Sequence, residues 1–340
     1  MGVAPMSVLV TGANGFVGLN LLERLLAAGC DVVSLSRRPI PAAAHPALAG
    51  QPGRLVEVLG DVRDTPLIEN TLRAQDVSAV VHMAAITAAA DREKRAADEV
   101  ISVNLCGLAS VMTASANVGV SRFVCAGSIA VYGGGADGSL LEEESPHAPR
   151  SLYAITKSAG DAVVARLGEL HGLDWVIGRL GRVFGPYEYD TGVRDTMSQI
   201  YQVTQAAIAG RAVVLARPCI KNWNYSRDAA ANLQALIDAP QLRHRIYNLG
   251  SPYAWSLAAW CESLARRYPD FSFGIGGGDG ESIDLGGGSD GGLLSWQRFA
   301  AEFGATAQFD RDAAFNDYMN FIDQESGDVV AAPASTAVTR

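Results

Sequence analysis

Short apolar runs alternate with longer segments of helical periodicity over the first half of the chain. Between Ser7 and Ser128 the runs are SVLVTG, DVVSLSR, RLVEVLGD, SAVVHMAA and RFVCAGS. Strands that alternate with helices predict a parallel sheet with helices packed on it. Because the runs are almost continuously apolar, both faces of that sheet should be buried. We therefore predict the α/β class, with a doubly wound parallel sheet.

The rhythm changes after a helix that begins near Ser151 and a further strand-like run, WVIGRLGRVFG. We predict a first domain at residues 1–185, to which segments of 219–250 return, a smaller C-terminal α/β region at 186–325, and a flexible tail at 326–340. The run IYNLG at 246–250 is expected in the main sheet. Asp228 is expected to be the N-cap of a helix over 228–238, and the glycine-dense segment 274–292 to be a mobile loop.

Composition and charge narrow the class of partner. The chain has 340 residues, of which 49% are hydrophobic and 19% charged, and its net charge is −9. These values exclude global disorder and argue against nucleic acid or an anionic membrane as partner, which leaves small molecules. The chain shows no apolar run of membrane length and no signal-like start, so a cytoplasmic location is expected.

Cysteine and histidine give no sign of a metal or disulfide framework. The five cysteines are odd in number and widely spaced, and we expect buried free thiols. They are Cys30, Cys106, Cys125, Cys219 and Cys261. The five histidines are scattered without HxxxH spacing, so no metal site is predicted.

The stretch TGANGFVG directly follows the first predicted strand and opens the first helix. Glycines at this position let a backbone amide and a helix N-terminus approach a pyrophosphate, and the helix dipole favours its negative charge. The stretch therefore predicts dinucleotide binding, and the first domain is interpreted as a Rossmann domain. The predicted contacts are Gly12, Asn14, Gly15, Phe16, Val17 and Gly18.

The ends of the second and third strands bear on the choice of cofactor. The position of the usual acidic residue is Ser36 here, followed by Arg37, which can pair with a 2′-phosphate. NADP is therefore favoured over NAD, with a solvated arginine as the alternative. Asp61, followed by Val62, could accept a hydrogen bond from the adenine amino group or could be a helix N-cap.

Taken together, these motifs resemble the extended short-chain dehydrogenase/reductase superfamily, in its NAD-dependent epimerase/dehydratase branch, over residues 6–325. HMAA at 82–85 is similar to the family's HLAA strand end, AGSIAVYG to its catalytic serine segment, SLYAITK to YxxxK, and RVFGP to VYGP. The resemblance implies that Met83, Ala84, Ala85 and Asn104 contact the cofactor. It further implies that Ser128 orients the substrate oxygen, that Tyr153 is the acid/base, and that Lys157 also holds the nicotinamide ribose.

The spacing of Tyr153 and Lys157 fits this chemistry, because residues four apart lie on one helix face. At ~4 Å and an effective dielectric of about 20, the ammonium would lower the phenol pKa by about three units. That shift brings the phenol from ~10 toward neutrality, where it can exchange a proton with a substrate hydroxyl.

Departures from the family pattern narrow the reaction. The two residues after Ser128 are Ile129 and Ala130, whereas family dehydratases have acidic residues there, which argues against dehydration. Arg182 and Lys221 are expected to bind substrate, although salt bridges to local carboxylates such as Glu188 are the alternative. The late glycine-dense segment has no cation for a nucleotide diphosphate. These features favour an oxidoreductase or epimerase acting on a small anionic carbohydrate, either a sugar acid or a sugar phosphate.

Two other functions remain open, a UDP- or dTDP-sugar 4-epimerase with tightly bound NAD and a non-catalytic dinucleotide sensor. A homodimer is expected, because the segment VISVNLCGLASVMTASA and the helix of Tyr153 are rich in small apolar residues.

Overall fold

A computed structural model describes residues 6–189, 194–304 and 307–331. The main sheet has seven strands in the order β11-β7-β5-β4-β1-β2-β3, and every pairing in it is parallel. Its strands are β1 (Ser7–Thr11), β2 (Asp31–Ser36), β3 (Leu55–Leu59), β4 (Ala79–His82), β5 (Arg122–Ser128), β7 (Trp175–Leu180) and β11 (Ile246–Leu249).

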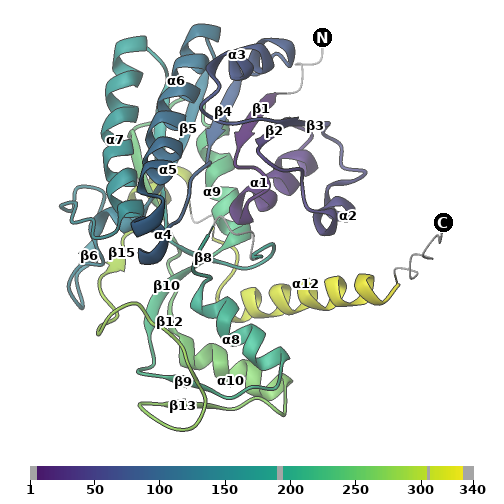
Figure 1. The fold of residues 1–340 in the computed structure, drawn as a ribbon, viewed down its shortest axis with the longest axis vertical. Helices are drawn as coiled ribbons and strands as arrows, with labels where there is room; N and C mark the ends of the chain where they lie inside the picture. The colour runs from purple at the N-terminus through teal and green to yellow at the C-terminus, as the bar shows by residue number, and fades with distance from the viewer. Residues whose placement is uncertain (1–5, 190–193, 305–306, 332–340) are drawn as a thin grey trace.

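Helices cover both faces of this sheet, as Figure 1 shows. One buried cluster joins the sheet to α1 (Phe16–Ala27), α2 (His45–Leu48) and α9 (Ser226–Asp238), and α11 (Gln297–Phe303) adds Phe299 to it. The opposite cluster contains α3 (Thr65–Ala74), α5 (Ala97–Ile101), α6 (Gly107–Val118) and α7 (Leu152–His171). The shorter helical segments are α4 (Ala90–Arg95), the π-helical η2 (Ser102–Cys106), and the 3-10 turns η1 (Ala42–Ala44) and η3 (Ile129–Tyr132). The Rossmann-type prediction is confirmed.

The C-terminal region is built on three small sheets with their own aromatic core around Trp223 and Trp260. Its strands are β8 (Arg182–Phe184), β9 (Val213–Leu215), β10 (Ile220–Tyr225), β12 (Ala254–Ser256), β13 (Phe273–Ile275) and β14 (Glu281–Ser282); β6 (Leu140–Leu141) pairs with β15 (Leu293–Leu294). Its helices are α8 (Gln199–Ile208), α10 (Leu257–Arg267) and α12 (Arg311–Ala331). In Figure 1, α8 and α10 lie together at one end of the molecule, and α12 extends outward from it.

The run at 246–250 joins the main sheet as predicted, since β11 pairs with β7. The expectation for Asp228 was wrong: α9 begins at Ser226, and the buried Asp228 carboxylate accepts hydrogen bonds from the backbone N–H groups of Gln308 (2.9 Å) and Phe309 (3.2 Å). Burial raises the pKa of Asp228 to about 6. Asp228 therefore fixes the entry to α12 instead of capping its own helix.

Three other expectations need qualification. Four cysteines are buried, but Cys106 is exposed because it faces outward at the end of η2. α12 includes residues 326–331 of the segment expected to be a tail, and 332–340 lie outside the described residues. The glycine-dense segment contributes β14 and is held by Arg217, whose guanidinium donates to the carbonyls of Gly287 (2.9 Å) and Ser289 (2.5 Å).

A continuous helical segment, Ala97–Val118, is long and apolar enough to cross a membrane by length and composition. Half of that stretch is buried inside the protein, where α6 packs against α3 and α7. Core packing therefore accounts for the apolar residues in the buried half of this segment.

Candidate active site

The glycine loop between β1 and α1 has the geometry that a bound pyrophosphate requires. Gly12 has φ +67°, and a Cβ there would lie 2.8 Å from the backbone of Ala84. At Gly18 a Cβ would lie 2.4 Å from the carbonyl oxygen of Ala13. Only glycine allows these close approaches between loop, helix and sheet.

The N-terminus of α1 is open to an anion. Gly15 is the N-cap and provides no side-chain hydrogen bond, and the first turn contains no acidic residue. The free N–H groups and the helix dipole therefore favour a negatively charged ligand at this end. Phe16 and Val17 form the first turn of this helix. The loop thus fits the pyrophosphate of a dinucleotide.

A pocket beside the loop brings together residues from the ends of β1, β2, β3 and β4. It is lined by Gly12, Asn14, Leu35, Ser36, Arg37, Arg38, Gly60, Asp61, Val62, Ala84, Ala85, Ile86 and Val103. Eight of the predicted cofactor residues are in this lining. The structure therefore brings these eight residues together from four separate strand ends.

Arg37 is half-exposed at this pocket, and its guanidinium lies 3.5 Å from the carboxylate of Glu99. Asp61 accepts hydrogen bonds from Arg63, at 2.8 Å from its Nε and 2.9 Å from its backbone N–H. The hydrogen bonds from Arg63 hold the pKa of Asp61 below its usual value. The N-cap of α3 is Asp64 instead, whose carboxylate accepts from the N–H of Leu67.

The end of β4 is fixed by Thr11, a residue of the glycine stretch. The Thr11 hydroxyl accepts from the N–H groups of Met83 (3.2 Å) and Ala84 (3.3 Å), and it lies 2.9 Å from His82 Nδ1. Burial lowers the pKa of His82 to about 3, so its ring is neutral near pH 7. Sequence reasoning did not single out Thr11, although it begins the quoted motif.

Asn104, which was predicted to contact the cofactor, has its side-chain amide bonded to protein groups in the structure. It lies in the π-helical turn η2, where its amide accepts from the N–H of Ile86 (2.8 Å) and donates to the Ile86 carbonyl (3.1 Å) and the Thr156 hydroxyl (3.0 Å). These bonds occupy both of its N–H groups. Asn104 therefore ties the chain after β4 to α7, close to the cofactor pocket.

The three residues predicted to be catalytic come from two adjoining elements. Ser128 ends β5, and its hydroxyl accepts from the N–H of Ala130 (3.2 Å). α7 begins after Ser151, which caps it, so that Tyr153 lies in the first turn. Lys157 lies one turn later; its Nζ donates to the Ala126 carbonyl on β5 (2.8 Å) and is 5.9 Å from the centre of the Tyr153 ring.

Arg182 and Lys221 lie on the adjacent strands β8 and β10. Lys221 is buried, donates to the Leu285 carbonyl (2.9 Å) and is 5.7 Å from the centre of the Trp223 ring. Among the described residues neither cation forms an ion pair, and no hydrogen bond of Arg182 is found there. Glu188 pairs with Arg194 instead, at 2.9 Å.

The comparisons with known proteins agree with this geometry. The model of the NAD dependent epimerase/dehydratase family matches residues 8–250. The low-salt glycan biosynthesis protein Agl12 of Haloferax volcanii is 31% identical over 252 residues, which cover 72% of this chain and 77% of that protein. A dTDP-glucose 4,6-dehydratase of Streptomyces niveus is 31% identical over 191 residues, 54% of this chain and 56% of the dehydratase. The chain therefore matches about half the length of that enzyme.

Solved structures show the same fold. MoeE5 in complex with UDP-glucose and NAD superposes with a TM-score of 0.74 at 23% identity, over 94% of this chain and 99% of that one. MoeE5 is also known in complex with UDP-glucuronic acid and NAD.

Proposed function

The chain belongs to the NAD dependent epimerase/dehydratase family, and from this premise we propose that it interconverts a secondary hydroxyl and a ketone on an anionic carbohydrate. Tyr153 would be the acid/base, Ser128 would orient the reacting oxygen, and Lys157 would favour the phenolate. The open glycine loop and the pocket beside it would hold a dinucleotide whose nicotinamide, when bound, supplies hydride chemistry.

The observation that carries the substrate class is the pair of cations on β8 and β10. Burial lowers the pKa values of both Arg182 and Lys221, and the charge of Arg182 lowers that of Lys221 further. Asp290 opposes the effect of burial on Arg182, but its carboxylate pairs with Arg217 at 2.7 Å. A desolvated cation without a counterion is unfavourable. A carboxylate or phosphate on the substrate would supply the missing negative charge.

The contacts of the neighbouring cations favour a small substrate. Arg217 is committed to Asp290 (2.7 Å) and to the glycine-dense segment, and Lys221 already donates to Leu285. Arg182 is left as the group able to form a direct bidentate contact, which suits one carboxylate or phosphate on a sugar acid or sugar phosphate.

A nucleotide-sugar 4-epimerase with tightly bound NAD is the second candidate. It is favoured by the relatives, whose names include a dTDP-glucose dehydratase and a structure with UDP-glucose. Some of these relatives are dehydratases, but Ile129 and Ala130 provide no acid or base for elimination in this chain. We therefore propose oxidation and reduction without dehydration. The family and the presence of Ser128, Tyr153 and Lys157 favour an enzyme over a non-catalytic sensor.

NADP is proposed as the preferred cofactor, although the solved neighbours contain NAD. Ser36 and Arg37 stand at the pocket where a 2′-phosphate would bind, and Arg37 is half-exposed. Glu99 competes for Arg37, so the preference should be modest.

The test is an NMR screen of purified protein with NAD and NADP against sugar acids, sugar phosphates, and UDP- and dTDP-sugars. Tyr153→Phe is the matched control, because it removes the proton-transfer group and keeps the ring. We expect turnover of a small anionic sugar that the Tyr153→Phe protein nearly loses. Turnover restricted to nucleotide sugars would replace the substrate proposal, and a Tyr153→Phe protein within a few-fold of wild type would overturn the acid/base role.

A further inference from the structure

A buried ion pair joins β7 to α7, the helix that carries Tyr153 and Lys157. Arg179 is charged within the otherwise apolar strand β7 and is 2% exposed. Its Nε and Nη2 lie 2.9 Å and 2.8 Å from one carboxylate oxygen of Asp161 on α7, which is 7% exposed. These two directional bonds fix the position of α7 relative to β7 more specifically than a pair of apolar side chains would.

The remaining donors of Arg179 reach the segments that flank the site. Nη1 donates to the Tyr132 hydroxyl (2.7 Å) and to the Glu143 carbonyl (2.9 Å). Nη2 lies 2.9 Å from His147 Nε2, which must accept because the guanidinium can only donate. His147 Nδ1 therefore carries the proton and donates to the Ser158 hydroxyl at 2.8 Å. Burial, and after it the charge of Arg179, lower the pKa of His147.

These contacts meet both halves of the proposed acid/base site. Asp161 lies one helical turn after Lys157, and Tyr132 ends the short turn that follows Ser128. A Cβ on Gly127, next to Ser128, would lie 3.1 Å from Arg179 Cγ, so the glycine makes room for the arginine stem. The stem of Arg179 is thus packed against β5, and its guanidinium is bonded to α7 and to the turn after Ser128.

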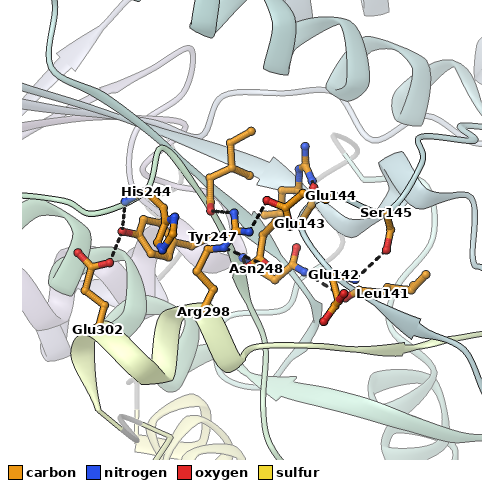
Figure 2. A network of polar contacts seen from close by, with 12 residues as sticks. Leu141, Glu142, Glu143, Glu144, Ser145, His244, Tyr247, Asn248, Arg298 and Glu302 are labelled. Atoms are coloured by element: carbon orange, nitrogen blue, oxygen red, sulfur yellow. Dashed lines mark hydrogen bonds and ion pairs between the residues drawn. The ribbon is translucent and has the colours of Figure 1, made fainter.

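An outer layer supports this arrangement. The Tyr132 hydroxyl donates to the Asn248 side chain at 2.7 Å, and the Asn248 N–H donates to a Glu143 carboxylate oxygen at 2.8 Å. Figure 2 shows Glu143 and Glu144 converging with Asn248 and Arg298. The partners of Arg179 are therefore held in turn by the main sheet, by the segment after β6 and by α11.

The charge of the pair bears on Lys157 as well. Asp161 interacts electrostatically with both Arg179 and the Lys157 ammonium, so its carboxylate offsets positive charge on both sides. The other titratable groups facing the pair are His147, Tyr132 and Glu143, and Glu93 accepts from the Leu152 N–H at the start of α7.

We propose that Arg179 and Asp161 are a positioning pair, which holds the helix of Tyr153 and Lys157 against the turn after Ser128 and balances charge behind Lys157. The inference rests on the proposed function of Tyr153, but its test needs no substrate.

The experiment is titration of the Tyr153 phenol by ultraviolet difference absorbance, each protein being measured against the same protein with Tyr153→Phe. Asp161→Asn leaves the Arg179 charge uncompensated and should favour phenolate. Eight residues of helix separate the groups by about 12 Å, so at an effective dielectric of about 20 to 40 the phenol pKa should fall by about half to one unit. Arg179→Met should shift it in the opposite direction, and the double variant should return it toward the wild-type value.

The control is Glu169→Gln, which removes one negative charge from the exposed end of the same helix and should leave the phenol pKa unchanged. If Asp161→Asn does not fold, Arg179→Met alone tests the proposal, which requires that variant to raise the phenol pKa. Equal phenol pKa values in all folded variants would overturn the charge-balancing role and leave a purely structural ion pair. Loss of the Tyr153 acid/base role would appear separately, as turnover that survives Tyr153→Phe.

Discussion

Replacing Arg182 with methionine tests the anion site from two sides, because stability and substrate binding should change in opposite directions. The guanidinium is half-buried near Lys221, and among the described residues no carboxylate lies within ion-pair distance of it. Asp290 acts on it only from farther away and pairs with Arg217 instead. Methionine keeps much of the stem volume and removes the charge. Without substrate, the free energy of unfolding should therefore rise, by about 1 to 2 kcal/mol, since an uncompensated cation is no longer desolvated.

The effect on catalysis should have the other sign. A charge-assisted hydrogen bond to a partly desolvated anion contributes about 1.5 to 3 kcal/mol, so KM should rise by a factor of about 10 to 100. The change in kcat should be smaller, because the anionic group is bound in both the ground state and the transition state. Arg182 would thus reduce the stability of the free protein in favour of binding.

Two measurements check this prediction on the same samples. Urea unfolding gives the free energy of unfolding, and steady-state rates with the substrate found by NMR give KM and kcat. Arg211→Met is the matched control, since Arg211 is an exposed arginine of the same region that pairs with Glu281 at 2.7 Å. An Arg182→Met protein that is less stable than wild type and has an unchanged KM would show that the guanidinium serves packing.

Three further results are expected. Arg37→Ala should weaken NADP binding by about tenfold or more and NAD binding less, because only NADP has a 2′-phosphate; calorimetric titration with equal losses would refute this. Light scattering at micromolar concentration should give a dimer, and Ile101→Asp, at a 42% exposed position on α5, should give a monomer; a wild-type monomer would remove the claim. Burial lowers the pKa of His82 to about 3 from 6.5, so the unfolded chain binds a proton first and stability should be lost as pH falls from about 6.5 toward 3. Between pH 6.5 and 3, the free energy of unfolding of His82→Asn should fall by up to about 4 kcal/mol less than that of wild type. His45→Asn, at an exposed position, should behave like wild type.

Eight of the residues predicted to bind the cofactor meet in one pocket, and the sequence signals that point to them are local. The glycine loop, Ser36, Asp61 and Ala84 each follow a recognisable strand, and parallel strands bring their carboxyl ends to one edge of the sheet. Their location in one pocket can therefore be predicted without knowing any long-range side-chain contact. The same reasoning placed β11 in the sheet from a short apolar run.

The network of Arg179 and Asp161 near the proposed acid/base residues was not predicted, because it depends on contacts between distant segments. Arg179 had one signal, a charge within the apolar run WVIGRLG, and Asp161 had another, its spacing of four from Lys157. Neither signal identifies His147 or Tyr132 as the remaining partners. Asp228 was misassigned for a related reason: propensity favours aspartate at an N-cap, whereas a tertiary contact with the chain before α12 determined its position.

Directional hydrogen bonds join β10, which carries Lys221, to the end of β11 in the main sheet, and they affect how the proposed site would work. Asn224 on β10 donates to the Leu249 carbonyl at 3.0 Å, and Asn222 donates to the Ser251 carbonyl at 3.1 Å. Both asparagines are buried, so these bonds fix the strand carrying Lys221 relative to the edge of the main sheet more specifically than apolar packing would. Because the same sheet carries Ser128 on β5, the proposed anion site and acid/base site would be held at a constant separation. A sugar bound by its charged group would then present one particular hydroxyl to Tyr153, and the length of the sugar between anion and hydroxyl would decide which substrates react.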